Sequence, residues 1–158
     1  TVGFLNAIPP VVSIVAMVWW SRHSDRTGER TWHVILACLA ASIGLIVAAG
    51  ANSIVGLIAA LTLVNVGISC AKPPLWSMPT MFLSGAAAAT GIATINSIGN
   101  LGGFAGPAMI GWIKDQTGSF TGGLYFVAGL LVLSAVLTLL LARSQRPTDA
   151  AAAEAAAH

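Results

Sequence analysis

Apolar residues run along this chain in long continuous stretches, separated by short polar or glycine-containing segments. The stretches cover residues 1–20, 33–51, 54–80, 87–112 and 120–141. Each has close to the roughly 20 residues that a helix needs to cross the hydrocarbon core of a bilayer. None shows the alternating pattern of about ten residues that is typical of outer-membrane β-strands. The pattern therefore predicts an all-α membrane protein with five transmembrane helices, the first of them truncated at its start.

Composition supports this prediction. Of the 158 residues 56% are hydrophobic and 8% are charged, whereas soluble domains carry about a quarter of charged residues. The net charge of +2 comes with no basic stripe, which argues against a nucleic-acid partner. Cys38 and Cys70 lie inside apolar stretches, and His23, His33 and His158 are scattered. No pair of these residues has the spacing of a metal or haem motif, so we expect no metal and no cofactor.

The basic residues predict the orientation of the helices, because cytoplasmic loops are enriched in Lys and Arg. Six of the seven basic residues fall on one side of the predicted membrane: Arg22, Arg26, Arg30, Lys72, Arg143 and Arg146. The other side receives the uncharged turn at 50–53, and Lys114 beside Asp115. We therefore expect a multi-pass protein of the bacterial inner membrane with a cytoplasmic tail at residues 142–158. Within this tail we expect residues 147–158 to be a disordered or fraying helical end.

Residues 21–32 form a short loop of mixed charge between the first two apolar stretches. Within it, Asp25 precedes the next helix, whose N-terminus favours a carboxylate, and Gly28 permits a tight turn. The simplest interpretation is a generic cytoplasmic loop whose arginines only hold the topology.

The same loop resembles the Major Facilitator Superfamily motif G-x-x-x-D-[RK]-x-G-[RK]-[RK], in the copy between the eighth and ninth helices of that fold. The matching residues are Asp25, Arg26, Gly28 and Arg30. Ser21 stands where the first glycine is usual, and Glu29 stands where a basic residue is usual. The resemblance implies that the acidic residue caps the next helix and pairs with an arginine, so that the loop gates a conformational change on the cytoplasmic side.

Three prolines, Pro73, Pro74 and Pro79, interrupt the third stretch and predict a broken helix. Such a break is tolerated at membrane depth only beside other helices or a water-filled cavity, which makes the segment a candidate part of a substrate path. Lys72 either faces this cavity and pairs with a substrate carboxylate, or snorkels to the headgroups. Trp76 and Ser77 are weaker candidates, since Trp76 also suits an interfacial anchor.

The fourth stretch is rich in small and polar residues. Asn96 and Asn100 are four residues apart and share one helix face. They either bind substrate or join helices by hydrogen bonds. Glycines at 99, 103 and 106 predict a seam for close helix packing. The last stretch is rich in Leu and Val, and we expect it to face lipid.

The pattern FLSG-x-A-A-A-x-G-I-A-x-I-N-S-I-G-N-L-G-G-F-x-G-P, with the preceding P-L-W-S-M-P-T, resembles the anion:cation symporter branch of the same superfamily. The resemblance covers nearly the whole chain and matches helices eight to twelve of a twelve-helix fold. It implies proton-coupled uptake of organic anions such as sugar acids, dicarboxylates and aromatic carboxylates by alternating access. The partners would then be the anion, protons, the lipid bilayer and the missing N-terminal helices of the same transporter.

Two other classes of protein remain open. An efflux antiporter of the same superfamily would share the loop motif, and a membrane assembly subunit would need no transport site. An enzyme is disfavoured because no nucleophile, base and carboxylate occur in a catalytic arrangement. No Asp or Glu lies within a predicted span, so a proton-coupling carboxylate would have to come from outside this chain.

Overall fold

The computed structural model describes residues 2–156, and the side chains of residues 9–81 and 83–144. Over this range the backbone is helical and contains no strand. The helices are α1 (Val2–Thr27), α2 (Thr31–Ala49), α3 (Ile54–Ser77), α4 (Pro79–Phe82), α5 (Gly85–Thr117) and α6 (Thr121–Ala156). Five are long and α4 is a single turn, so the predicted all-α fold with five long helices is confirmed.

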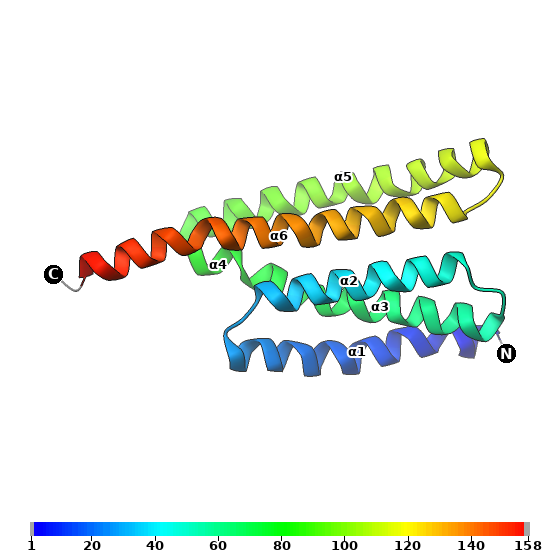
Figure 1. Cartoon of the computed structure of the whole chain (residues 1–158), viewed down its shortest axis with the longest axis horizontal. Helices are drawn as coiled ribbons and strands as arrows, with labels where there is room; N and C mark the ends of the chain where they lie inside the picture. Colours follow the sequence, from blue (N-terminus) through cyan, green and yellow to red (C-terminus); the bar gives the residue numbers. More distant parts are fainter. Residues whose placement is uncertain (1, 157–158) are drawn as a thin grey trace.

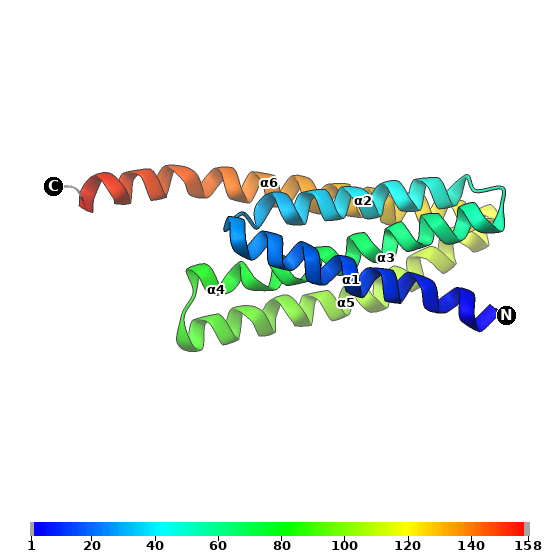
Figure 2. The ribbon, with the colours of Figure 1, turned by 90° about the horizontal axis from the view of Figure 1, so that it is seen from below.

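The five long helices lie side by side along the length of the molecule (Figure 1). α1, α2 and α3 form one group, in which α1 and α2 each pack against α3. α5 and α6 form a hairpin, and this hairpin joins the group through contacts between α6 and α2. In the view from below, α5 lies beneath α3 and α1, and α6 beside α2 (Figure 2). The helices therefore form an up-and-down bundle.

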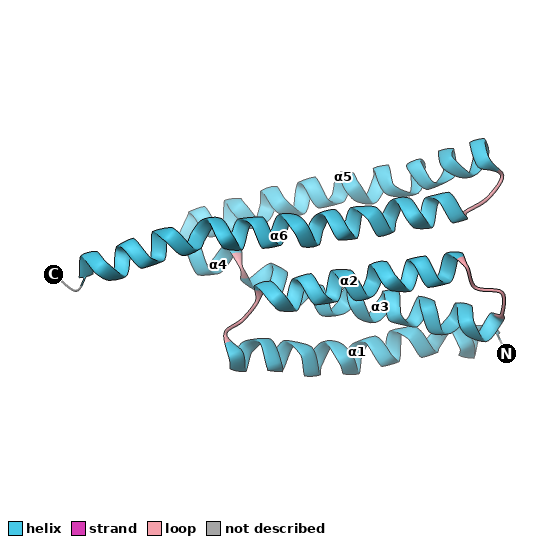
Figure 3. Ribbon diagram, viewed as in Figure 1, coloured by secondary structure: helices cyan, strands magenta, loops and turns pink. Residues whose placement is uncertain are grey.

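Short loops connect the helices at the two ends of the bundle (Figure 3). One end carries the turn at residues 28–30, the α4 turn and the loop that leads into α5. The other end carries the loops at 50–53 and 118–120. Arg22, Arg26 and Arg30 lie at the first end, while Lys114 lies near the second, where its ammonium stands 4.3 Å from the ring centroid of Phe120.

Glycine and alanine bring α2 and α3 into close contact. A Cβ atom on Gly67 would lie 2.6 Å from the carbonyl oxygen of Ala37 and 2.7 Å from the Cβ of Ala41. A Cβ atom on Gly44 would lie 2.9 Å from the backbone nitrogen of Val64. Small side chains let helix backbones approach and gain dispersion contacts, as is common for helix pairs in membranes. This seam is the most tightly packed part of the bundle.

One face of α6 packs against α2 rather than facing lipid as we expected. Ala128 and Ala135 are buried there, and the Ser42 hydroxyl of α2 donates a hydrogen bond of 3.1 Å to the Ala128 carbonyl oxygen. The expectation overlooked the small residues that recur along α6 among the leucines, since these allow the close approach. Only the remaining faces of α6 are available to lipid.

The helices end in places that differ from the predicted boundaries. α1 runs on to Thr27, so Asp25 and Arg26 lie in its last turn rather than in a loop. α3 passes through Pro73 and Pro74 and ends at Ser77, so only the third proline, at the start of α4, marks the break. Tandem prolines near a C-terminus leave just the carbonyls of the preceding turn without donors, which a continuing helix tolerates. α6 continues as a helix to Ala156, through the segment that we expected to fray; residues 157–158 lie outside the described residues.

The predicted packing seam on α5 has no partner helix among the described residues, so it stays a prediction. No residue of α5 is buried, and a Cβ atom on Gly99, Gly103 or Gly106 would have no neighbour within 4 Å. The reason is that α5 packs mainly against α6 and the short α4. Its glycine-rich faces are therefore open.

Among the described residues, three segments are long and apolar enough to cross a membrane: Thr31–Ala49, Ile54–Met81 and Thr121–Ser144. α1 and α5 are long enough by number of residues but carry more polar and small side chains. α2, α3 and α6 thus form the most hydrophobic part of the bundle.

Candidate functional site

The turn between α1 and α2 is closed by glycine and by one ion pair. Gly28 ends α1 with φ +67°, a left-handed conformation that costs glycine little. Across the turn, Arg30 Nη2 lies 3.5 Å from Asp25 Oδ1, and the Asp25 side chain is 62% exposed. An ion pair with this exposure contributes little to stability. The ion pair instead links the end of α1 to the start of α2 across the turn.

Glu29, which departs from the motif, performs the capping that the resemblance assigned to the acidic residue Asp25. Glu29 Oε1 accepts a hydrogen bond of 3.2 Å from the backbone N–H of Trp32, in the first turn of α2. A carboxylate at this position also meets the positive end of the helix dipole. Ser24, which is buried, donates its hydroxyl to the Glu29 carbonyl oxygen at 3.2 Å. The turn is therefore held from both helices.

A histidine pair joins α1 to α2 just inside this turn. His23 Nδ1 lies 2.8 Å from His33 Nε2, so the two imidazoles share a hydrogen bond. The Trp20 indole N–H donates to the His33 carbonyl oxygen at 3.3 Å, and its ring meets the His33 ring edge-on. The Trp19 ring stacks on His23 with centroids 6.0 Å apart. Sequence reasoning missed this cluster because it treated the histidines as scattered.

Three of the predicted site residues lie at the end of α3. Lys72 is exposed, and Trp76, one turn later on the same face, is 39% exposed. Ser77 is half-buried, and its hydroxyl donates a hydrogen bond of 2.9 Å to the Pro74 carbonyl oxygen. Asn65, seven residues before Lys72 on the same face, is also exposed. The spacing of seven was the available signal for Asn65, but it was overlooked.

Asn96 and Asn100 lie on α5 with exposed side chains. The neighbouring hydroxyls of Thr94 and Ser97 donate to carbonyl oxygens of their own helix, at 2.9 Å each. Neither asparagine amide has such a partner among the described residues. These amides are therefore free to bind another group.

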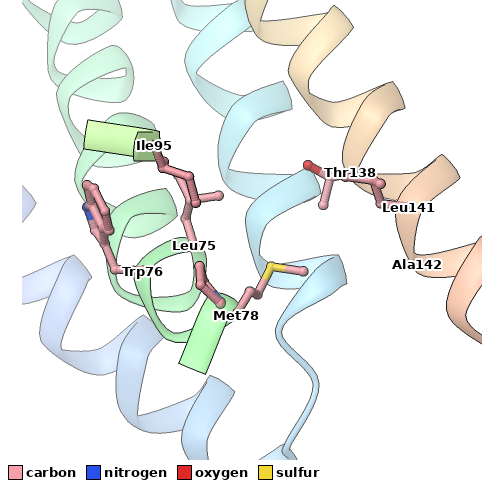
Figure 4. A pocket seen from close by; sticks show the side chains of 8 residues that line it. Leu75, Trp76, Met78, Ile95, Thr138, Leu141 and Ala142 are labelled. Atoms are coloured by element: carbon pink, nitrogen blue, oxygen red, sulfur yellow. The ribbon is translucent and has the colours of Figure 1, made fainter. Parts of the chain in front are cut away.

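A cavity of about 220 Å³ opens between the end of α3, α5 and α6 (Figure 4). Its lining residues are Leu75, Trp76, Met78, Pro79, Ile95, Thr138, Leu141 and Ala142. The Thr138 hydroxyl already donates to the Ser134 carbonyl oxygen at 2.8 Å, so the lining is almost wholly apolar. Trp76 is the one predicted site residue among these lining residues, whereas Lys72, Ser77, Asn96 and Asn100 do not line the cavity. An anion would find no charge partner inside.

Comparison with known proteins identifies the family. Residues 1–157 match the model of the Major Facilitator Superfamily. Two proteins of Agrobacterium vitis, both named "Putative tartrate transporter", are 76% and 71% identical over 143 residues, 90% of this chain. A "Quinolone resistance transporter" of Acinetobacter baumannii is 36% identical over 140 residues, 89% of the chain. No solved structure matches the chain.

The aligned part is 32–33% of the length of these relatives, so this chain spans about a third of each of them. The family match and the predicted all-helical fold agree. This chain belongs to the Major Facilitator Superfamily of membrane transporters.

Proposed function

We propose that this chain is the C-terminal part, helices eight to twelve, of a secondary transporter that imports small organic anions of the tartrate class. The observation that carries the proposal is the identity of 76% to a protein named as a tartrate transporter. Dicarboxylates, sugar acids and aromatic carboxylates share the carboxylate that such a site would recognise.

The proposed substrate site consists of the polar side chains on α3 and α5. Lys72 would pair with a substrate carboxylate, and Asn96 and Asn100 would donate to carboxylate or hydroxyl oxygens. Their exposure and the free amides support this assignment. Trp76 and Ser77 would form the wall beside Lys72; Ser77 acts only as an acceptor while its own proton is held by Pro74.

The open faces of α5 are proposed to meet the N-terminal helices of the same transporter. In support, none of the α5 residues is buried, and glycines 99, 103 and 106 leave room for another helix backbone. The site would then be completed only when both halves are present, as in carriers that rock around a midplane site.

The turn with Asp25, Arg26, Gly28 and Arg30 is proposed as the conformational gate of alternating access. Its position at one end of the bundle, and the ion pair across it, support this role. The grouping of Arg22, Arg26 and Arg30 at that end supports its assignment to the cytoplasm of a bacterial inner membrane, with the C-terminus on the same side.

Protons are the proposed coupling ion. The spans assigned to this chain hold no Asp or Glu, so we assign the coupling carboxylate to helices outside it.

An efflux antiporter is the second candidate, favoured by the 36% identity to a quinolone resistance transporter. The two functions differ in the direction of transport. The weaker identity makes it the less supported of the two.

The site proposal is tested by uptake of labelled tartrate in cells that express the whole transporter with single substitutions. We expect Asn96→Ala and Lys72→Ala to raise KM about tenfold or more, because each removes a bond to a charged group. Ser97→Ala is the matched control, since its hydroxyl is bound to Ala93 within the helix. Unchanged KM in both site variants, with normal protein levels, would contradict the assignment.

A further inference from the structure

We propose that the His23–His33 pair is a proton-binding site that ties α1 to α2 at the end of the bundle next to the turn at 28–30. The observation behind it is the distance of 2.8 Å between His23 Nδ1 and His33 Nε2. At this distance one ring must donate its N–H and the other must accept. The protonation state of the pair therefore decides whether this hydrogen bond joins α1 to α2.

The neutral pair can bind one further proton without losing the bridge. Its four ring nitrogens carry two protons, and one of these bridges the rings. The bare nitrogen is then either His23 Nε2, on an exposed ring, or His33 Nδ1, on a ring that is 94% buried. His33 Nδ1 has no hydrogen-bond partner among the described residues. A buried polar atom without a partner is rare and calls for a functional explanation.

Binding of one proton strengthens the junction. The singly protonated pair has three protons: one in the bridge, one on His23 Nε2 and one on His33 Nδ1. The bridge becomes a charge-assisted hydrogen bond, which is shorter and stronger than a neutral one. The Trp20 ring, 4.9 Å from the His33 ring, and the Trp19 ring, 6.0 Å from the His23 ring, offer π-systems beside the new charge.

Binding of a second proton breaks the junction, because both facing nitrogens then carry an N–H and neither accepts. Among the side chains that the structure describes, the charged residues on the elements around the pair are Arg22, Asp25 and Arg26 on α1, Glu29 and Arg30 in the turn, Lys72 on α3 and Arg143 on α6. None of them forms a salt bridge with either imidazole in the described part of the chain.

The pair lies where its hydrogen bond can hold α1 against α2. α1 and α2 each pack on α3, and at this end they meet through Trp20, His23, Ser24 and His33. Below the pair, Val34 and Cys38 are buried in a cluster with Ala135 of α6, so His33 stands on a rigid support. His23 is the exposed partner, which solvent can reach. This inference depends on the proposed function only for the assignment of this end to the cytoplasm.

The test is histidine-selective ¹⁵N NMR of the whole transporter in lipid nanodiscs, with the two ring signals assigned by their loss in His23→Gln and His33→Gln. We expect a scalar coupling between the bridging nitrogens at neutral pH. It should persist as the first proton binds and vanish when both rings are charged. His23→Gln should abolish it and alter the pH response of the His33 signals.

Two results would overturn the proposal. One is the absence of the coupling at every pH, with each ring titrating as before when the other is replaced. The other is a stoichiometric shift of both signals on addition of Zn²⁺, which would make the pair a metal site. Since this readout needs no transport, a coupled pair in a protein that takes up no organic anion would leave the inference standing and remove the proposed function. Anion uptake without a coupled pair would do the reverse.

Discussion

Gly67 of α3 lies so close to Ala37 of α2 that a Cβ atom on the glycine would stand 2.6 Å from the alanine carbonyl oxygen. The opposing atom is backbone, which cannot swing aside as a side chain would. The two helices can keep this distance only while residue 67 has no side chain. Close packing of α2 against α3 therefore requires glycine at position 67.

Gly67→Ala should destabilise the bundle by about 1–3 kcal/mol, the usual cost of overpacking a tight interface. The measurement is the thermal unfolding of the purified protein in detergent. Gly129→Ala on α6 makes the same chemical change where a Cβ meets nothing within 4 Å, and should leave the midpoint unchanged or slightly raised. Equal midpoints for the two variants would show that α2 and α3 are not packed this closely.

Gly28→Ala should cost about 1–2 kcal/mol of stability, because φ +67° is strained for a residue with a Cβ. Gly28→Asn should cost less, since asparagine tolerates the left-handed conformation. The same unfolding assay ranks the three proteins. An alanine variant as stable as the glycine protein would mean that the turn does not need this conformation.

Asp25→Asn should change stability by less than about 1 kcal/mol, because the ion pair with Arg30 is exposed. If the turn is the gate, the substitution should still slow transport, so we expect a lower maximal rate at nearly unchanged stability. Arg30→Lys, which keeps the charge, is the control. A loss of stability and of rate in the same proportion would point to a purely structural turn.

Glu29→Ala should destabilise the start of α2 by about 1 kcal/mol, because the Trp32 N–H loses its acceptor. Glu29→Gln keeps an oxygen at the same position and should lose less. Hydrogen exchange of the first turn of α2 is the readout. Equal protection in the two variants and the parent would show that Glu29 does not cap the helix.

All five long helices should cross the membrane, including α1 and α5, which are less apolar than the others. Single cysteines at Asn52 and Ser119 should react with an impermeant thiol reagent from one side, and a cysteine at Ser84 from the other. The buried Cys38 and Cys70 are replaced by alanine in this experiment. Labelling of Ser84→Cys and Ser119→Cys from the same side would mean that α5 does not span.

The fold was predictable from hydropathy, because continuous apolar runs of about 20 residues specify helices whatever their partners. The contacts between helices were harder to foresee. His23 and His33 are each five residues from Gly28, so an antiparallel turn at this glycine brings them together. Counting outward from the turn would have found the pair, whereas a search for metal spacings did not.

The close packing of α2 against α3 could also have been predicted from the sequence. Ala37, Ala41, Gly44 and Ala48 recur at intervals of four, three and four residues, which places small residues on one helix face. The glycines of α5 carry a similar signal but meet no helix of this chain. A small-residue pattern indicates a close approach without naming the partner. The free amides of Asn96 and Asn100 likewise indicate a hydrogen-bond partner without identifying it.

The most direct test of proton-coupled anion import is transport by the whole protein in proteoliposomes with an imposed proton gradient. An inward-directed gradient should drive accumulation of labelled tartrate, and unlabelled dicarboxylates or sugar acids should compete with it. A quinolone should not be transported. No accumulation of any organic anion, or export of the quinolone in its place, would contradict it.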